Sequence, residues 1–535
     1  MNCRPSCAIL ERMAHSTRFK RALGFKSILI CVLLTCVAFF VVGTIHWPLV
    51  GDASLMHYVV FLMQHGRSPY RDIVDMNMPG SYLVEWAQMH VFGSGAMGLR
   101  LFDLSLMGVA AGAMVAIAWP QDWFAGVYAA ALLLLIHGRD GVDQMAERDL
   151  TMTVLLLVGY AFLFHALRKQ TENPRSLPVR ISGWAMALSG ACFGMAATLK
   201  PTVAPLEFVL LALLAWQSKK NRQPRSTPVA QLIVSSLVGF AIPCAIALFF
   251  LAREHALHAF WRILTGLVPY HASIGRLPIR YFLRYSLQPG FVWLALLCLG
   301  IAAARKDWRS NESVALWIGF AFGMASLAAQ GKGYPYHRYP SEAFLLLLAG
   351  LNFTAALQRP GLLRVAGMLG LCFGVLLLAP VSTAKTLHYD WQNQEFITLL
   401  QGDLNALGGA KLSGRVQCLD TTAGCINTLY QMHLVQDTGF LYDCYFFAPQ
   451  PSPVQTALRE QFWRDIQNKP PEVFVVTNQM CVSPASNYRK LDAWPQLQHY
   501  LDANYSLYAQ RTALRPVRWW SHSRPPFGYR IYMRK

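Results

Sequence analysis

Eleven long apolar runs, separated by short polar segments, occupy the chain between residues 27 and 380. A helix of about 20 apolar residues crosses the roughly 30 Å hydrocarbon core of a bilayer. This pattern predicts a polytopic α-helical membrane protein with about eleven transmembrane helices. No small-residue cleavage pattern follows the first run, so we interpret it as a retained span and not as a signal peptide. The runs cover residues 27–45, 99–118, 123–137, 150–167, 181–199, 202–217, 229–251, 288–303, 314–329, 341–357 and 363–380.

Composition and charge agree with this pattern. Of the 535 residues, 54% are hydrophobic and only 14% are charged, whereas about 25% is usual for soluble domains. The formal net charge is +19, but the basic residues gather between apolar runs, as the positive-inside rule expects of cytoplasmic loops. This explanation argues against nucleic-acid binding. With a cytoplasmic N-terminus, five basic segments all fall on the cytoplasmic side, namely residues 4–26, 168–180, 219–225, 305–309 and 359–364.

The same topology divides the chain into three parts. Residues 1–26 form a basic cytoplasmic N-terminus, residues 27–380 a transmembrane domain, and residues 381–535 a domain on the outer, periplasmic face. In the last part, Ser452 and Pro453 open a capped helix that runs to Ile466. Short β-rich runs cover residues 473–477 and 529–533. We expect a small α/β or α+β domain here.

Four cysteines of this outer domain suit an oxidising compartment. They can form two disulfides with three possible pairings, and their spacing matches no zinc motif. They are Cys418, Cys425, Cys444 and Cys481.

Residues 46–98 form the first outer loop, in which apolar side chains recur at helical spacing in two places. We expect two amphipathic helices that lie at the membrane interface. Their apolar stripes are Met56, Val59, Val60 and Met63 in the first helix and Tyr82, Leu83, Trp86 and Met89 in the second.

Two carboxylates stand at the outer ends of spans. Asp52 closely follows the first span, where a carboxylate is costly unless it is paired, solvated or used. It can act as a general base towards an acceptor hydroxyl, or it can simply cap the helix that begins there. Asp149 opens the fourth span, where it either caps that helix or orients the acceptor or the base.

Cations gather in the outer segment of residues 330–340. Lys332, His337 and Arg338 stand there among three tyrosines and two prolines, a combination that suits a lipid phosphate at headgroup depth. The tyrosines are also typical of an interfacial aromatic belt. Lys200, which ends the fifth span before Pro201, either snorkels to the interface or contacts a phosphate.

In their order and membrane side, these residues resemble the GT-C superfamily of glycosyltransferases that use polyprenyl-phosphate sugars, near the protein mannosyltransferase and aminoarabinose transferase branch. The resemblance covers roughly residues 25–380. It implies an inverting transfer on the outer leaflet, with Asp52 as the base and Asp149 as the second outer carboxylate. The matching segments are Asp52, residues 66–72 in a Gly-x-x-Pro-Tyr-x-Asp arrangement, residues 75–82, 92–93, 99–101 and 148–149, and residues 194–201 ending in Lys-Pro.

One position departs from the family pattern. Relatives often have a lysine before the proline of the first loop, where this chain has Asn77. A neutral amide positions a sugar or phosphate oxygen but offers no charge to the leaving group. Either Lys332, His337 and Arg338 supply the charge, or the donor differs, or activity is lost.

The sequence thus predicts a bacterial inner-membrane glycosyltransferase that uses a polyprenyl-phosphate sugar and a lipid, glycan or protein acceptor. Outer carboxylates can hold Mg²⁺ or Mn²⁺, but no ligand cluster requires a metal. The alternative is a non-catalytic lipid or glycolipid transporter or envelope assembly factor, although a transporter typically has polar residues at mid-membrane on broken helices. The predicted donor-phosphate ligands are Lys200, Lys332, His337 and Arg338, and the predicted substrate-positioning residues are Asp75, Asn77, Tyr82 and Arg148.

Overall fold

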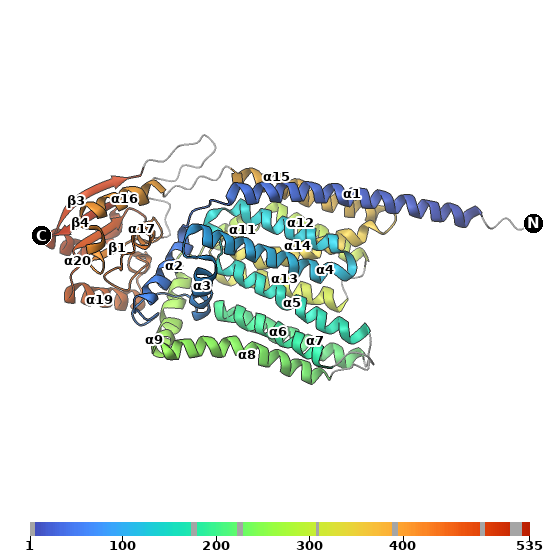
Figure 1. The fold of residues 1–535 in the computed structure, drawn as a ribbon, viewed down its shortest axis with the longest axis horizontal. Coiled ribbons are helices and arrows are strands. Elements are labelled where there is room, and N and C mark those ends of the chain that lie inside the picture. The colour runs from blue at the N-terminus through green and yellow to red at the C-terminus, as the bar shows by residue number, and fades with distance from the viewer. Residues whose placement is uncertain are drawn as a thin grey trace, which may run out of the picture.

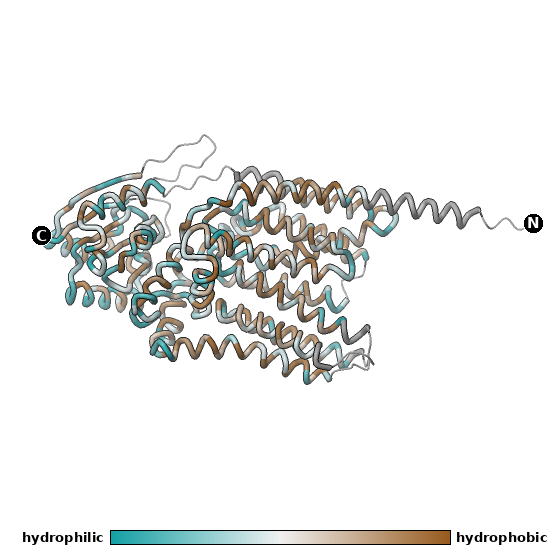
Figure 2. The backbone as a smooth tube through the Cα atoms, viewed as in Figure 1, coloured by the Kyte–Doolittle hydropathy of each residue, from teal (hydrophilic) through white to brown (hydrophobic). Residues whose placement is uncertain are grey.

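A bundle of long helices and a small unit of helices and strands make up the chain. The computed structural model describes residues 6–172, 179–221, 228–305, 310–387, 394–481, 487–513 and 527–535. The C-terminal unit covers one end of the bundle, and helix α1 (Ser6–Thr44) extends beyond the other end (Figure 1). Apolar residues predominate along the helices, and polar residues gather at helix ends and in the C-terminal unit (Figure 2). Parts of the predicted basic segments 4–26, 168–180, 219–225 and 305–309 lie outside the described residues.

Helix α4 (Ala96–Asp140) forms two of the predicted spans. It is too long for one crossing, contains Pro120 and leaves helical geometry at Asp122. Its second half returns along the first, since a Cβ at Gly126 would lie 2.6 Å from Cα of Val115. The predicted spans 99–118 and 123–137 are therefore the two arms of a hairpin. The other long helices are α5 (Arg148–Glu172), α6 (Val179–Leu199), α7 (Ala204–Asn221), α8 (Val229–Arg253), α12 (Pro289–Arg305), α13 (Asn311–Gln330), α14 (Tyr339–Leu357) and α15 (Leu362–Leu387).

Each of the eleven predicted spans falls on one of these helices. Within the described residues, seven helices are long and apolar enough to cross a membrane, and two shorter apolar helices accompany them. Helix α14 is buried from Tyr339 to Thr354, as expected of a helix that is apolar on all sides and surrounded by others. The predicted fold class, a polytopic helical membrane protein with a small C-terminal α/β unit, is confirmed.

The C-terminal unit is built on a mixed four-stranded sheet of order β1-β2-β4-β3. Strand β1 (Val416–Leu419) is parallel to β2 (Val473–Thr477), whereas β4 (Gly528–Arg534) is antiparallel to both β2 and β3 (Tyr505–Thr512). The predicted strands are β2 and β4, and the predicted helix is α19 (Pro453–Asn468), which Ser452 caps by accepting a hydrogen bond from N of Val454. The other helices of the unit are α16 (Gln394–Ala406), α17 (Cys425–Gln431), α18 (Cys444–Phe447) and α20 (Pro495–Asn504).

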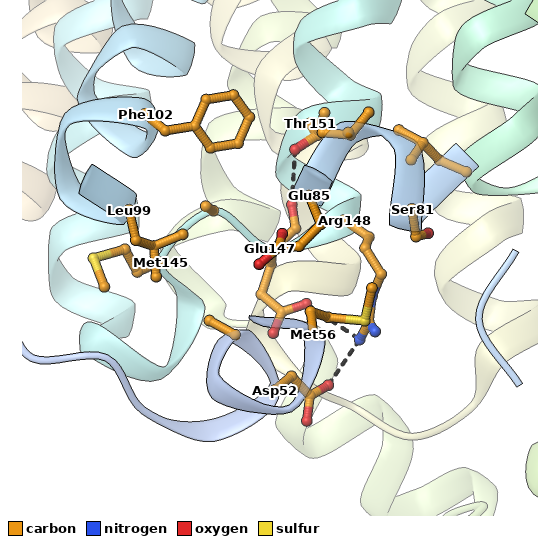
Figure 3. A pocket seen from close by; sticks show the side chains of 14 residues that line it. Asp52, Met56, Ser81, Glu85, Leu99, Phe102, Met145, Glu147, Arg148 and Thr151 are labelled. Atoms are coloured by element: carbon orange, nitrogen blue, oxygen red, sulfur yellow. Dashed lines mark hydrogen bonds and ion pairs between the residues drawn. The ribbon is translucent and has the colours of Figure 1, made fainter. Parts of the chain in front are cut away.

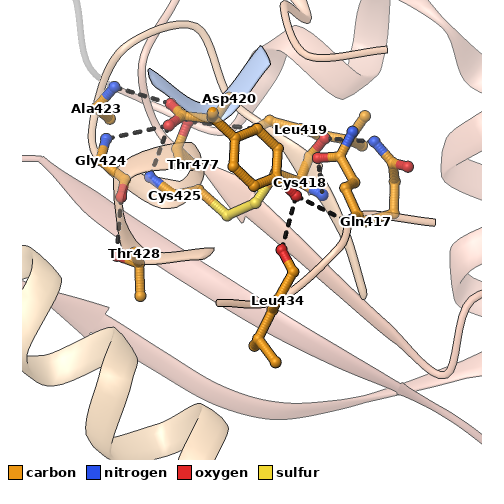
Figure 4. Close-up of a disulfide and its surroundings, with 12 residues drawn as sticks. Gln417, Cys418, Leu419, Asp420, Ala423, Gly424, Cys425, Thr428, Leu434 and Thr477 are labelled. Carbon is orange, nitrogen blue, oxygen red and sulfur yellow. Dashed lines mark hydrogen bonds between the residues drawn. A yellow bond between two sulfur atoms is a disulfide. The ribbon is translucent and has the colours of Figure 1, made fainter. Parts of the chain in front are cut away.

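Two disulfides constrain the segments that follow strands β1 and β2. Of the three possible pairings, the structure has Cys418 with Cys425 and Cys444 with Cys481. The first closes the loop after β1, where the carboxylate of Asp420 accepts hydrogen bonds from the backbone N–H groups of residues 423, 424 and 425 (Figure 4). The loop is therefore rigidly shaped by both covalent and hydrogen bonds.

The first outer segment forms two helices, α2 (Gly51–Gln64) and α3 (Pro79–Phe92), at the end of the bundle that bears the C-terminal unit. Helix α3 keeps an exposed face that includes Trp86. Helix α2, in contrast, is buried on every side from Ser54 to Leu62. The C-terminal unit covers it: the hydroxyl of Tyr58 donates to O of Leu434 (2.9 Å) and accepts from N of Gln436 (2.7 Å). The unit is thus an integral wall of the region in which Asp52 lies.

Candidate functional site

Arg148, the first residue of α5, connects two predicted residues of the first outer segment, Asp52 and Asn77. Its Nη2 donates to Oδ2 of Asp52 at 2.7 Å and lies 3.5 Å from Oε2 of Glu147 (Figure 3). Its Nη1 donates to Oδ1 of Asn77 at 2.6 Å. The N-cap position of α2 is Val50. Asp52 lies in the first helical turn and directs its carboxylate to Arg148 instead of to the helix backbone.

Asn77 connects Arg148 to a buried carboxylate. Its Nδ2 donates to both oxygens of Asp75 at 3.1 and 2.8 Å. The hydroxyl of Tyr82 donates to the same carboxylate at 2.8 Å, and burial raises the pKa of Tyr82 well above its ordinary value, so it stays a donor. The four predicted substrate-positioning residues therefore form one hydrogen-bonded network.

Asp149 and Lys200, predicted for different roles, pair with each other. Nζ of Lys200 lies 2.7 and 2.6 Å from the two oxygens of Asp149 and donates to Oε1 of Gln330 at 2.8 Å. The carboxylate of Asp149 is almost fully buried. Because a buried carboxylate needs a partner, Lys200 has a structural reason to point inward and not towards the interface.

Lys332 has a partner that the sequence did not suggest. Its Nζ donates to Nε2 of His271 at 2.7 Å, from the short helix α10 (Val268–Ser273). Burial, followed by the positive charges of Lys332 and Arg148, lowers the pKa of His271 to about 3, so the imidazole is neutral and accepts. Burial also lowers the pKa of Lys332 to about 8, an effect that Asp52 opposes. Lys332 and Asp52 therefore interact electrostatically.

The C-terminal unit closes this side of the site. The rings of Tyr442 and Tyr445 lie 6.1 and 5.9 Å from that of His271, and the hydroxyl of Tyr270 donates to O of Tyr445 at 3.1 Å. No motif marks His271 in the sequence, because its role depends on a lysine 61 residues away.

The remaining two predicted phosphate ligands lie in the short 3-10 helix η5 (Pro335–Arg338), directly before α14. Arg338 donates to Glu342 at 3.2 Å and to both oxygens of Asp140 at 3.3 Å. His337 lies against Tyr336, with ring centroids 4.5 Å apart, and its Nδ1 is buried with no hydrogen-bond partner in the described part of the chain. The guanidinium of Arg338 is thus neutralised by protein carboxylates, whereas His337 keeps an unused polar atom.

A buried ionic network behind the site holds the loop that carries Glu147. Asp103 pairs with Arg100 and with Nε2 of His137 (3.0 Å), and it accepts from the backbone N of Ala146 at 2.8 Å. The ring of His137 also hydrogen-bonds the hydroxyl of Tyr339 at 2.9 Å. The sequence suggested only Arg100, through the family resemblance.

A pocket opens beside Asp52 and Arg148 (Figure 3). Its polar lining includes Ser81, Glu85 and Glu147, and burial raises the pKa of Glu147 to about 8. Apolar side chains form the rest of the wall. Among the described residues, no group of three or more His, Cys, Asp or Glu side chains is arranged to hold a metal ion. The apolar lining residues are Ala53, Met56, Val84, Leu99, Phe102, Met145, Ala146 and Leu199.

No protein-family model and no curated protein sequence matches the chain. Solved structures match its fold. ArnT from Cupriavidus metallidurans bound to undecaprenyl phosphate is similar with a TM-score of 0.57 and 12% identity, over 94% of this chain and 98% of that one. The Archaeoglobus fulgidus oligosaccharyltransferase tethered with an acceptor peptide is similar with a TM-score of 0.56 and 11% identity, over 90% of this chain and 73% of that one.

A second structure of the archaeal enzyme, AglB in complex with an inhibitory peptide and a dolichol-phosphate, has a TM-score of 0.54 and 10% identity over the same shares of the two chains, 90% and 73%. The similarity extends over both the helical bundle and most of the C-terminal unit, because it covers 94% of the chain in the ArnT comparison. The chain therefore has the GT-C fold that its sequence predicted.

Proposed function

We propose that this chain is a membrane glycosyltransferase that moves a sugar from a polyprenyl-phosphate carrier to a cell-envelope acceptor, with inversion at the anomeric carbon. The observation that supports it most directly is the cluster of Asp52, Arg148 and Lys332 on a GT-C fold. Two structures of this fold hold polyprenyl carriers, namely undecaprenyl phosphate in ArnT and a dolichol-phosphate in AglB.

In this proposal Asp52 is the general base. An acceptor hydroxyl attacks the anomeric carbon and passes its proton to the free oxygen of the Asp52 carboxylate, while the bond between that carbon and the phosphate oxygen breaks. The bonding electrons leave with the polyprenyl phosphate. Arg148 fixes the carboxylate through its Nη2, so the base needs little reorganisation when the acceptor arrives.

Lys332 holds the leaving phosphate by hydrogen bonds, and Lys200, whose Nζ contacts Asp149 and Gln330, contributes its positive charge. The N–H groups of Lys332 that are not used by His271 can donate to phosphate oxygens, and a charge-assisted hydrogen bond to phosphate is stronger than one between neutral groups. Asp149 orients Lys200 through its two short contacts. His337 supplies a further ligand with its unused Nδ1. Arg338, paired with Asp140 and Glu342, contributes by fixing the turn that carries His337.

We further propose a bacterial inner-membrane location, with the C-terminal unit in the periplasm. Two observations support this orientation of the chain in the membrane. The paired cysteines, Cys418 with Cys425 and Cys444 with Cys481, suit an oxidising compartment, and the basic segments of the sequence favour a cytoplasmic location for the opposite end of the bundle.

The decisive experiment compares Asp52→Asn with the unmodified protein in membranes supplied with a labelled polyprenyl-phosphate sugar. Asparagine keeps the shape of the side chain and an acceptor oxygen for Arg148, but it cannot take a proton. Since general-base catalysis contributes about 10²–10⁴-fold, transfer should fall at least a hundredfold. Asp72→Asn is the matched control, because Asp72 belongs to the same outer segment and pairs with the exposed Arg71.

Donor binding, measured in the same membranes, separates the two predicted functions. An Asp52→Asn protein that binds the donor but transfers nothing supports the enzyme. Full transfer by Asp52→Asn excludes Asp52 as the base, and donor binding by the unmodified protein without any transfer favours the non-catalytic lipid transporter or assembly factor instead.

A further inference from the structure

The segment between Glu254 and Asp307 has an unusual charge. It contains five arginines, one lysine and three histidines but no aspartate or glutamate. Four of these arginines, all except Arg305, belong to the loop predicted to be outside, at residues 252–287. Arginine in a short outer loop opposes the positive-inside rule. An excess of cations on the outer face therefore indicates a functional role for these residues.

Three of the arginines belong to an amphipathic element. Helix α11 (Ile279–Ser286) turns Phe282 and Ser286 inward, where they are 8% and 1% exposed. The next strip around the helix carries Ile279 and Leu283, which are 70% and 45% exposed. Arg280 and Arg284 form the strip beyond it, one turn apart, and are exposed. Arg276 is exposed just before the helix.

Protein carboxylates do not neutralise this strip. In the part of the chain that the structure describes, Arg276, Arg280 and Arg284 have no ion pair. The guanidinium of Arg280 lies over the neighbouring ring of Tyr281, 4.7 Å from its centroid. This contrasts with Arg148, Arg168 and Arg338, each of which is paired.

An exposed apolar strip beside a cationic strip is the pattern of a helix that lies in the plane of a bilayer surface. Ile279 and Leu283 would enter the boundary of the acyl chains, and the arginines would lie at the depth of the lipid phosphates. Helix α9 (Leu257–Arg262), earlier in the same outer segment, also exposes Leu257 and Trp261, residue types that suit a membrane interface.

Helix α11 is also tied to the proposed site. The backbone N of Leu277 donates to O of Gly331 at 2.9 Å, and a Cβ at Gly331 would lie 3.1 Å from Cγ of Arg276. Gly331 directly precedes Lys332. A displacement of α11 would therefore also displace the loop that carries Lys332.

We propose that Arg276, Arg280 and Arg284 bind anionic phospholipid headgroups and so hold α11 and the loop of Lys332 at the membrane surface. A cation at an anionic lipid surface contributes about 1 kcal/mol, or about fivefold per residue. Phospholipid is favoured over the rarer donor because the cationic strip is exposed and adjoins an apolar strip suited to bulk acyl chains.

The test uses the full chain in nanodiscs that contain photoactivatable phosphatidylglycerol or phosphatidylcholine at equal mole fractions and with identical acyl chains. Crosslinks to the peptide of residues 276–286 are quantified by mass spectrometry. The unmodified protein should prefer phosphatidylglycerol at least fivefold. The preference should fall to near one when Arg276, Arg280 and Arg284 are all changed to glutamine, and it should persist in the matched control with lysine at the same three positions.

Equal labelling by the two lipids in the unmodified protein, or an unchanged preference in the glutamine variant, would overturn the proposal. So would loss of phosphatidylglycerol crosslinks on addition of about one mole per cent farnesyl phosphate, since the strip would then be a site for the donor carrier. The measurement needs no sugar transfer, so its outcome is independent of whether Asp52 is the base.

Discussion

Lys332 offers a quantitative test of the proposed donor site. Burial lowers its pKa to about 8, and only the protonated amine can hold a donor phosphate by charge. His271 accepts a hydrogen bond from Lys332 and, with a pKa of about 3, is already neutral at physiological pH. Lys332 is therefore the member of this pair that changes charge as the pH rises above neutrality.

The size of the effect follows from the pKa. A group with a pKa of about 8 is about 90% protonated at about pH 7 and about 10% protonated at about pH 9. The value of kcat/KM for the donor should therefore fall about tenfold over this interval. An unperturbed lysine, with a pKa of about 10.4, would lose almost no charge. The ratio kcat/KM is the appropriate quantity because it reports groups of the free enzyme.

The assay is initial-rate transfer from a labelled polyprenyl-phosphate sugar at several pH values in detergent or nanodiscs. Lys332→Arg is the informative variant, since arginine stays charged throughout the range: it should flatten the alkaline fall. Lys332→Met should raise the donor KM at neutral pH and remove the pH dependence. A flat profile in the unmodified protein, or an alkaline fall that persists unchanged in Lys332→Arg, would refute this role for Lys332.

Three further variants probe the surroundings of the site. Burial raises the pKa of Glu147 to about 8, so the side chain is protonated at about pH 6.5. Glu147→Gln resembles this protonated form and should keep most transfer activity at that pH. A hundredfold loss of activity would show that the carboxylate acts in its ionised form. Lys200→Met leaves the buried Asp149 without its cation and should lower the free energy of unfolding by about 3–5 kcal/mol. Thermal unfolding measures this loss, and adding Asp149→Asn should restore part of the stability. Tyr58→Phe removes two hydrogen bonds to the C-terminal unit, at about 1 kcal/mol each, and should speed hydrogen exchange at Gln436; unchanged exchange would contradict the docking role of that hydroxyl.

The helical bundle could be predicted because its information is local. Each apolar run carries enough hydrophobic residues to identify a span on its own, and even the hairpin of α4 is marked by the polar break around Pro120 and Asp122. The wholly buried α2 was less predictable. Its sequence has one apolar stripe, but the C-terminal unit covers the opposite face. No local pattern predicts a contact with residues more than 370 positions away.

In the candidate site, too, the individual residues could be predicted from local sequence but their contacts could not. Asp52, Asp149 and Lys332 are visible in the sequence because charge at the end of a span is costly. Their partners are not: the contacts of Lys332 with His271 and of Asp149 with Lys200 depend on how separate helices pack. Sequence alone therefore identified charged groups near the site, whereas the structure shows which of them neutralise one another.

The pairing of Arg148 with Asn77 gives the departure from the family pattern a physical reason. Asn77 uses its amide in both directions, since Oδ1 accepts from Arg148 and Nδ2 donates to Asp75. A lysine at this position would lose the acceptor oxygen and place a second cation beside Arg148, where two charges about 4 Å apart repel by about 4 kcal/mol at an effective dielectric constant near 20. The neutral amide is therefore suited to a site whose positive charge comes from α5 and from the loop of Lys332. Under the proposed function, Arg148 and Lys332 would supply the positive charge that a lysine in the first loop supplies in relatives, so the absence of that lysine does not argue against activity.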